Sequence, residues 1–72
     1  MLSEGKIENK LYYLRTSRKW TQKELAEKLS VSRQTIVSLE ANRYSPSLML
    51  AFKISELFET GIEDIFSYHK NE

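Results

Sequence analysis

The segment from Thr21 to Arg43, TQKELAEKLSVSRQTIVSLEANR, constrains the fold most, because it has the pattern of two short helices joined by a tight turn. Thr21 can cap the first helix, and Glu24, three residues later, completes a capping box. Trp20 and Leu25 have the spacing of a hydrophobic staple. These signals predict a helix that begins directly after Thr21.

A second helix is predicted after a break at residues 30–32. Ser32 can cap it, and Ile36 and Leu39 point to one side. An arc of about 140° on the other side, at 100° per residue, holds Arg33, Gln34, Val37, Ser38 and Ala41. A helix-turn-helix needs this division, since one side of its second helix packs on the domain while the other enters the major groove of DNA.

A structural pair of amphipathic helices would show part of the same pattern. The outward face of an ordinary solvated helix is rich in Glu and Lys, whereas this arc carries Arg, Gln, Ser and Val and no acidic residue. Ala26 is small where the two helices would cross, so they can approach closely. The composition of the arc therefore favours a DNA-binding face over a purely structural helix pair.

Composition excludes several other classes of protein. The 72 residues form one domain, residues 1–72, whose small core buries roughly 60% of the unfolded-state surface. The chain has no cysteine, and its single His69 cannot form a metal cluster. No apolar run is long enough to span a membrane, and no signal peptide is apparent. We therefore expect a cytoplasmic protein with no metal, no cofactor and no small-molecule ligand.

Charge is unevenly distributed, although the net charge is only +1. Residues 1–50 carry nine Lys or Arg against five Glu, a net of +4, and residues 51–72 carry two Lys against five acidic residues, a net of −3. A basic body and an acidic end would orient the molecule in a phosphate field, although ordinary solvated charge explains the same distribution.

A first helix is predicted ahead of the helix pair by the spacing of Ile7, Leu11 and Leu14. We expect it to start between residues 6 and 9 and to end near residue 18. The short segment before it can also pair with residues 66–68 as a small two-stranded ribbon. With the helices that follow, the predicted fold is all-α, with five short helices.

A fourth helix is predicted from Ser45 or Ser47, either of which can cap it, to about residue 59, and Thr60-Gly61 ends it. A short fifth helix follows. Apolar residues occupy well over half the circumference of the fourth helix, whereas covering one core needs a stripe of roughly 100° or a little more. A second surface must cover the excess, so we predict a homodimer formed through the C-terminal half. The candidate interface residues are Leu57, Phe58, Ile62, Ile65, Phe66 and Tyr68.

The chain also carries a family pattern. Thr-Gln-x-Glu-Leu-Ala, Ser-Arg-Gln-Thr-Ile, Leu-Glu, Pro-Ser-Leu and Glu-Asp-Ile-Phe occur in this order. With these motifs, residues 7–66 resemble the helix-turn-helix domain of the phage repressor and Cro family, also called the XRE family, and its small stand-alone members above all. The resemblance implies a five-helix, lambda-repressor-like fold and a sequence-specific transcriptional regulator. It also implies a repressor that binds a two-fold symmetric operator in double-stranded DNA as a homodimer.

The resemblance implies roles for individual residues. The base-reading positions are Arg33, Gln34, Val37 and Ser38. The positions near DNA phosphates are Gln22, Thr35, Asn42, Arg43 and Tyr44, and Gln22 can also brace the recognition helix. Arg15 and Glu40 match an ion pair that ties the first helix to the recognition helix. Val37 stands where many relatives place a polar residue, which favours contact with a thymine methyl group over a hydrogen bond.

Other functions compete with this interpretation. A helical protein-interaction module can use the same fold, and an antitoxin that represses its own operon is a variant of the repressor. An enzyme is disfavoured, because the sequence shows no paired carboxylates, no nucleophile with a base, no phosphate-binding loop and no metal cluster.

Overall fold

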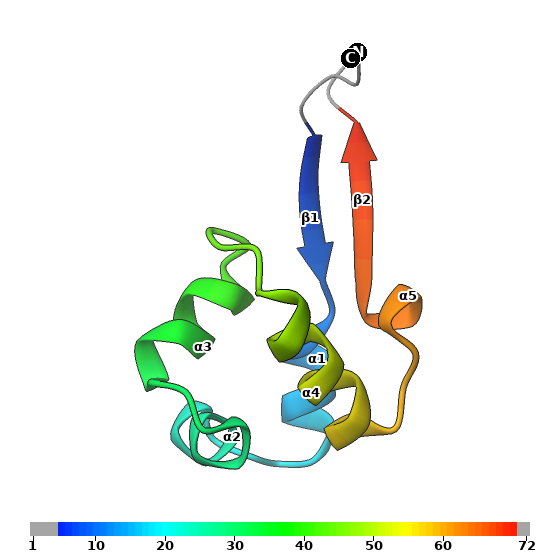
Figure 1. Ribbon diagram of the computed structural model, residues 1–72. Helices are drawn as coiled ribbons and strands as arrows, with labels where there is room; N and C mark the ends of the chain where they lie inside the picture. Colours follow the sequence, from blue (N-terminus) through cyan, green and yellow to red (C-terminus); the bar gives the residue numbers. More distant parts are fainter. Residues whose placement is uncertain (1–4, 71–72) are drawn as a thin grey trace.

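The structure, a computed structural model, describes residues 5–70. Within this range it contains five short helices and a two-stranded antiparallel ribbon that projects from them (Figure 1). In chain order the elements are β1 (Gly5–Asn9), α1 (Leu11–Ser17), α2 (Gln22–Leu29), α3 (Arg33–Glu40), α4 (Leu48–Phe58), α5 (Ile62–Ile65) and β2 (Phe66–Lys70). The five predicted helices and the predicted ribbon are present, so the fold is mostly helical without being strictly all-α.

Hydroxyl side chains cap three of the helices. At the start of α2, the Thr21 hydroxyl accepts a hydrogen bond from the Glu24 N–H (3.0 Å), and the Glu24 carboxylate accepts one from the Thr21 N–H (2.9 Å), which confirms the capping box. Ser32 caps α3 in the predicted place. Of the two serines considered for α4, Ser47 is the cap and Ser45 is not.

Left-handed residues follow four of the helices, and the first of them, Lys19 (φ 59°), comes after α1. Ser30 (φ 58°) follows α2, Asn42 (φ 58°) follows α3 and Glu59 (φ 51°) follows α4. The left-handed Asn42 agrees with the tolerance of asparagine for this conformation. At α4 the left-handed residue is Glu59, and neither Thr60 nor Gly61 has a positive φ. The Thr60 N–H then donates to the Ser55 carbonyl (3.0 Å).

One hydrophobic core lies between the helices, and all five helices contribute to it. Its largest fully buried side chains are Leu11, Leu25, Ile36, Leu39, Ile54 and Ile65. Ala26 is buried as well, at the small position predicted between α2 and α3. Because Ile36 and Leu39 are completely buried, the opposite side of α3 must face solvent.

The first helix begins later than its apolar spacing predicts. α1 starts at Leu11, and Ile7 lies in β1, where it is paired with Tyr68 of β2. Pairing with β2 gives the backbone of β1 the partners that a helix would otherwise supply. The Asn9 side chain then accepts a hydrogen bond from the Leu11 N–H (2.9 Å), which fixes the start of the helix two residues later.

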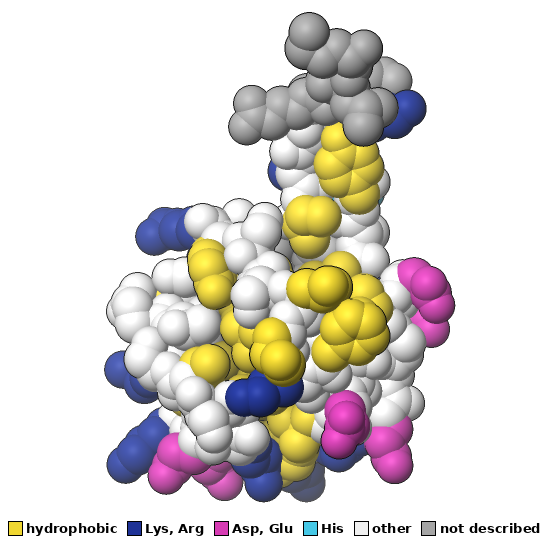
Figure 2. Space-filling view, in the orientation of Figure 1, with side chains coloured by type: hydrophobic (Ala, Val, Ile, Leu, Met, Phe, Trp, Pro, Cys, Tyr) yellow, Lys and Arg dark blue, Asp and Glu magenta, His cyan; other side chains and the backbone are white. Residues whose placement is uncertain are grey.

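The ribbon has one apolar and one polar face, because side chains alternate along a strand. Ile7, Phe66 and Tyr68 share one face, and Lys6, Glu8, Ser67 and His69 share the other. Figure 2 shows hydrophobic side chains continuing from the ribbon down over the helical body. A two-stranded ribbon is marginally stable by itself, so its apolar face needs a cover.

Two residues predicted for a dimer interface are core residues instead. Phe58 is 3% exposed and Ile65 is 1% exposed, because both side chains point into the core of the single chain. Leu57 also packs against this core. The excess apolar surface of α4 lies at Leu48, Met49 and Phe52, which are 72%, 71% and 57% exposed. Ile62 and Phe66 are partly exposed and Tyr68 is exposed.

Candidate nucleic-acid interface

The outward side of α3 carries the predicted base-reading residues. Arg33 and Gln34 are exposed in its first turn, and Val37 and Ser38 are partly exposed one turn later. α3 lies at the edge of the molecule, on the side away from α5 (Figure 1). Since the other side of α3 packs in the core, the backbone that carries these four side chains is held in place.

A buried ion pair joins the last turn of α3 to α1. Arg15 Nε donates to Glu40 Oε2 (2.6 Å) and Arg15 Nη2 donates to Glu40 Oε1 (3.0 Å). The two side chains are only 11% and 7% exposed, and Arg15 Nη1 also donates to the Trp20 carbonyl (2.8 Å). The hydrogen bonding to Glu40 raises the pKa of the Arg15 guanidinium above its ordinary value. The ion pair predicted between these residues is thus present.

Gln22 extends this network to α2. Its Nε2 donates to Glu40 Oε1 (3.1 Å), so the Glu40 carboxylate holds α1, α2 and α3 together. This is the bracing role considered for Gln22. Only one of the two Nε2 protons is used in this bond, and the other is free to meet a ligand oxygen. At the opposite end of α3, the Thr35 hydroxyl lies 2.9 Å from the Ser32 hydroxyl, beside the cap.

The loop after α3 folds back toward the end of that helix. The left-handed Asn42 turns the chain, and the Arg43 N–H donates to the Ser38 carbonyl (3.0 Å). Tyr44 then lies beside α3, where it lines a shallow hollow of about 170 Å³ with Gln34, Thr35 and Ser38. Candidate base-reading and candidate phosphate-binding residues therefore meet at this hollow.

Asn9 belongs to the same region, although the sequence pattern did not indicate it. Its Nδ2 donates to the Leu39 carbonyl (2.9 Å) and to Asn42 Oδ1 (3.2 Å). The available signal was an asparagine just before a helix, a position that favours capping residues. The expectation of a helix start at residues 6–9 concealed that signal.

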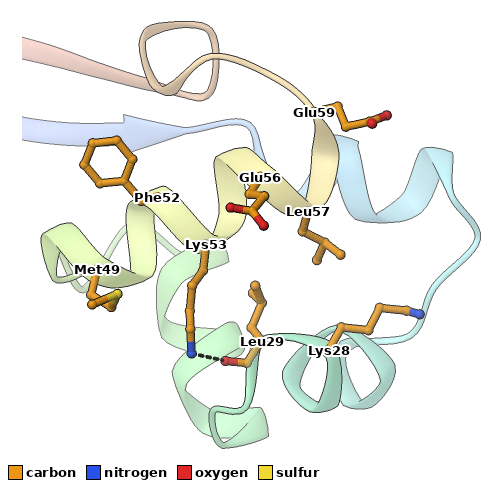
Figure 3. A pocket seen from close by; sticks show the side chains of 8 residues that line it. All are labelled: Lys28, Leu29, Met49, Phe52, Lys53, Glu56, Leu57 and Glu59. Atoms are coloured by element: carbon orange, nitrogen blue, oxygen red, sulfur yellow. Dashed lines mark hydrogen bonds between the residues drawn. The ribbon is translucent and has the colours of Figure 1, made fainter.

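A larger groove lies between α2 and α4 (Figure 3). It encloses about 490 Å³ and is lined by Lys28, Leu29, Met49, Phe52, Lys53, Glu56, Leu57 and Glu59. Lys53 Nζ donates to the Leu29 carbonyl (3.4 Å), and Lys28 Nζ lies 4.5 Å from the centroid of the Trp20 ring. Both lysines therefore have partners within the chain.

The described residues 5–70 also bear on membrane spanning and on metal binding. In that part of the chain, no helix combines the length and hydrophobicity needed to cross a membrane. Nor do three or more His, Cys, Asp or Glu side chains come together there in a group that could hold a metal ion.

The order and packing of these helices are shared with known proteins. A family model described as helix-turn-helix matches residues 11–65, from the start of α1 to the end of α5. The chain belongs to the XRE-type helix-turn-helix family. The match includes α2, α3 and the Glu40 network, and it excludes both strands of the ribbon.

Two HTH-type relatives cover most of the chain. The HTH-type transcriptional regulator MJ0272 of Methanocaldococcus jannaschii is 53% identical over 66 residues, which are 92% of this chain and 100% of that protein. YgzD of Bacillus subtilis, also an HTH-type transcriptional regulator, is 40% identical over 60 residues, covering 83% of this chain and 91% of that one.

Solved structures show the same fold. The transcriptional regulator VanUg superposes with a TM-score of 0.78 at 25% identity, over 99% of this chain and 96% of that chain. A DNA-binding protein from Bacteroides fragilis shares the fold with a TM-score of 0.74 at 24% identity, over 85% of this chain and 98% of that chain. This XRE-type protein is thus a transcriptional regulator with a DNA-binding helix-turn-helix fold.

Proposed function

We propose that the protein is a sequence-specific repressor that binds a two-fold symmetric operator in double-stranded DNA as a homodimer. The observation that carries this proposal is the exposed first turn of α3, where Arg33 and Gln34 stand on a helix whose other side is fixed by the core and by Glu40. A helix-turn-helix domain by itself can repress, since occupying a promoter is enough to block it.

The chemistry of α3 suits base reading. Arg33 can donate two hydrogen bonds to guanine, and Gln34 can pair with adenine through both its donor and its acceptor. Val37 supplies a methyl surface for thymine, and the Ser38 hydroxyl can donate to or accept from a base edge. These four residues are therefore our candidates for direct sequence recognition.

The residues around α3 suit phosphate binding. Gln22 lies at the N-terminus of α2 with one amide proton unused, and Thr35 lies beside the cap of α3. Asn42, Arg43 and Tyr44 form the exposed loop after α3. Contacts of this kind fix the register of a protein on DNA and carry no sequence information themselves.

A second copy of the chain is the proposed cover for one apolar patch, which we define as Ile7, Leu48, Phe52, Ile62, Phe66 and Tyr68. Five of its members are close together, since Ile7, Leu48, Ile62 and Phe66 line one hollow of about 320 Å³ and Tyr68 is paired with Ile7. Phe52 follows Leu48 by one helical turn on α4. A two-fold dimer would present two copies of α3 to half-sites about 34 Å apart.

A binding array across all single-base variants of a selected site, at two salt concentrations, tests the role of each residue. Arg33→Ala should cost roughly 1–3 kcal/mol on the best site and flatten the preference at one base pair, and Gln34→Ala should do the same at a neighbouring position. Arg43→Ala should weaken all sequences alike and reduce the slope of log affinity against log salt by about one. Gln22→Ala is the matched neutral control, which should weaken binding with little change in slope.

The array also distinguishes the alternatives. If Arg33→Ala scaled every site equally while Arg43→Ala changed the preferred base, the two roles would be inverted. If neither substitution affected binding to DNA, the protein-interaction module would become the better explanation of this surface.

Sedimentation of Phe52→Glu tests the dimer, because this side chain is 57% exposed and can change without disturbing the core. We expect a monomer that still binds a single half-site but binds the full operator more weakly. Tyr13→Glu is the matched control, since Tyr13 is 70% exposed on α1, outside the apolar patch. An unchanged chain that stays monomeric at tens of micromolar and binds one copy per site would refute the dimer.

A further inference from the structure

Asn9 joins three parts of the molecule through one side chain. It is the last residue of β1 and is paired with Phe66 at the base of the ribbon. Its Oδ1 accepts from the Leu11 N–H (2.9 Å), while its Nδ2 donates to the Leu39 carbonyl (2.9 Å) and to Asn42 Oδ1 (3.2 Å). The two donated bonds cross 30 and 33 residues of sequence, so they are tertiary contacts and not local capping.

The groups that Asn9 holds are those that set the end of the recognition helix. The Leu39 carbonyl is in the last turn of α3, and it also accepts from the N–H of Asn42 (3.1 Å). Asn42 is the left-handed residue that turns the chain, and Arg43 follows it directly. A shift of this turn would therefore move Arg43 relative to α3.

The other end of the connection is firmly attached to the body. The backbone N–H of Lys10, next to Asn9, donates to the Ile65 carbonyl at the end of α5 (2.9 Å). Asn9 thus lies between a fixed junction, where β1, α1 and α5 meet, and the turn that presents the phosphate-binding loop. The core does not supply such a tie, because residues 41–45 are all exposed.

We propose that Asn9 is a positioning residue for DNA binding, which sets the Asn42–Arg43 turn against the base of the ribbon. The inference rests on the proposed function, because it assigns Arg43 to a phosphate contact. The three bonds at this point need two N–H donors and one acceptor oxygen, and an asparagine amide supplies the donors from its NH₂ group and the acceptor from its carbonyl. Aspartate keeps the acceptor and loses the donors, while alanine loses all three bonds.

The experiment compares Asn9→Ala with Ser55→Ala, a matched control. Ser55 Oγ donates to the Thr60 carbonyl (2.6 Å) at the far end of α4, so its loss also removes a partly buried side chain–backbone bond. Both variants should melt at a lower temperature. Only Asn9→Ala should weaken binding to a selected duplex, by about threefold to tenfold, the loss expected for one net hydrogen bond. Its base preference should stay unchanged.

The combined effect of Asn9→Ala and Arg43→Ala on DNA affinity distinguishes a positioning role from a merely structural one, because only a positioning role makes the two effects non-additive. If Asn9 acts through the loop, Asn9→Ala should have much less effect in an Arg43→Ala background than in the unchanged chain. It should also lower the salt dependence of affinity toward that of Arg43→Ala.

The outcomes distinguish failure of the proposed function from failure of the positioning role alone. Absence of duplex binding by the unchanged chain would overturn the proposed function and this inference with it. If the unchanged chain binds and Asn9→Ala binds as well as Ser55→Ala, only the positioning role is refuted. Fully additive effects of Asn9→Ala and Arg43→Ala would refute it as well.

Discussion

Arg15→Ala is expected to destabilise the fold strongly. The substitution removes three hydrogen bonds at 2.6, 3.0 and 2.8 Å, two to the Glu40 carboxylate and one to the Trp20 carbonyl. Glu40 would keep only the bond from Gln22 (3.1 Å), in a position where its side chain is 7% exposed. With so little solvent and no cation beside the carboxylate, the cost of burying its negative charge is no longer offset.

The size of the effect follows from this burial. Removing one partner of a buried pair costs about 3–5 kcal/mol, and a small domain has only about 5–15 kcal/mol in total. In a domain of this size each kcal/mol lowers the melting temperature by roughly 4–8 °C. We therefore expect the melting temperature of Arg15→Ala to fall by at least about 12 °C.

Thermal unfolding followed by circular dichroism measures this effect. Glu8→Gln is the control, since its carboxylate makes only exposed contacts, with Lys6 Nζ (3.8 Å) and with His69 Nε2 (3.4 Å). Such an exposed pair contributes less than about 1 kcal/mol. Replacing both buried partners, in Arg15→Met with Glu40→Leu, should recover much of the stability, because no charge is left unpaired. Equal shifts for Arg15→Ala and Glu8→Gln would refute the reasoning.

Three further predictions concern local features. Hydrogen bonds with the Thr21 backbone N–H and hydroxyl lower the pKa of Glu24, so its charged form stabilises the fold at neutral pH and the contribution is lost as pH falls through the lowered pKa. Glu24→Gln should therefore melt at a lower temperature than the unchanged chain at pH 7, and the two melting temperatures should converge in acid; parallel pH profiles would contradict this. Gly5→Ala should weaken amide protection in the ribbon, because a Cβ there would lie 2.6 Å from the Tyr68 ring; full protection by hydrogen exchange would contradict it. Ser47→Ala should cost about 1 kcal/mol in urea unfolding by removing the cap of α4, and an unchanged midpoint would show that the cap is dispensable.

Much of the fold depends on interactions within a few residues, and these were predictable from the sequence. The capping box of Thr21 and Glu24 and the cap at Ser32 involve atoms only three residues apart. The division of α3 into an inward and an outward side follows from its helical period, and burial of Ile36 and Leu39 agrees with it. The candidate reading face was predictable for the same reason.

Only the tertiary structure decided where the chain departs from these local rules. The helix expected from residues 6–9 gave way to a strand, because β1 finds its partner in β2, at the other end of the chain. On α4, apolar residues surround most of the helix, so the spacing alone could not tell that Phe58 belongs to the core and Phe52 to the surface.

The amino-acid sequence by itself thus determined the helix-turn-helix, its caps and its outward face, since each depends on neighbours along the chain. The contacts of Asn9 with α3, across 30 and 33 residues, depend on how distant elements are placed relative to one another. The periodicity of one helix carries no information about that placement. The hydrogen bonds of Asn9, at the base of the ribbon, with the Leu39 carbonyl and with Asn42 were therefore decided only by the tertiary structure.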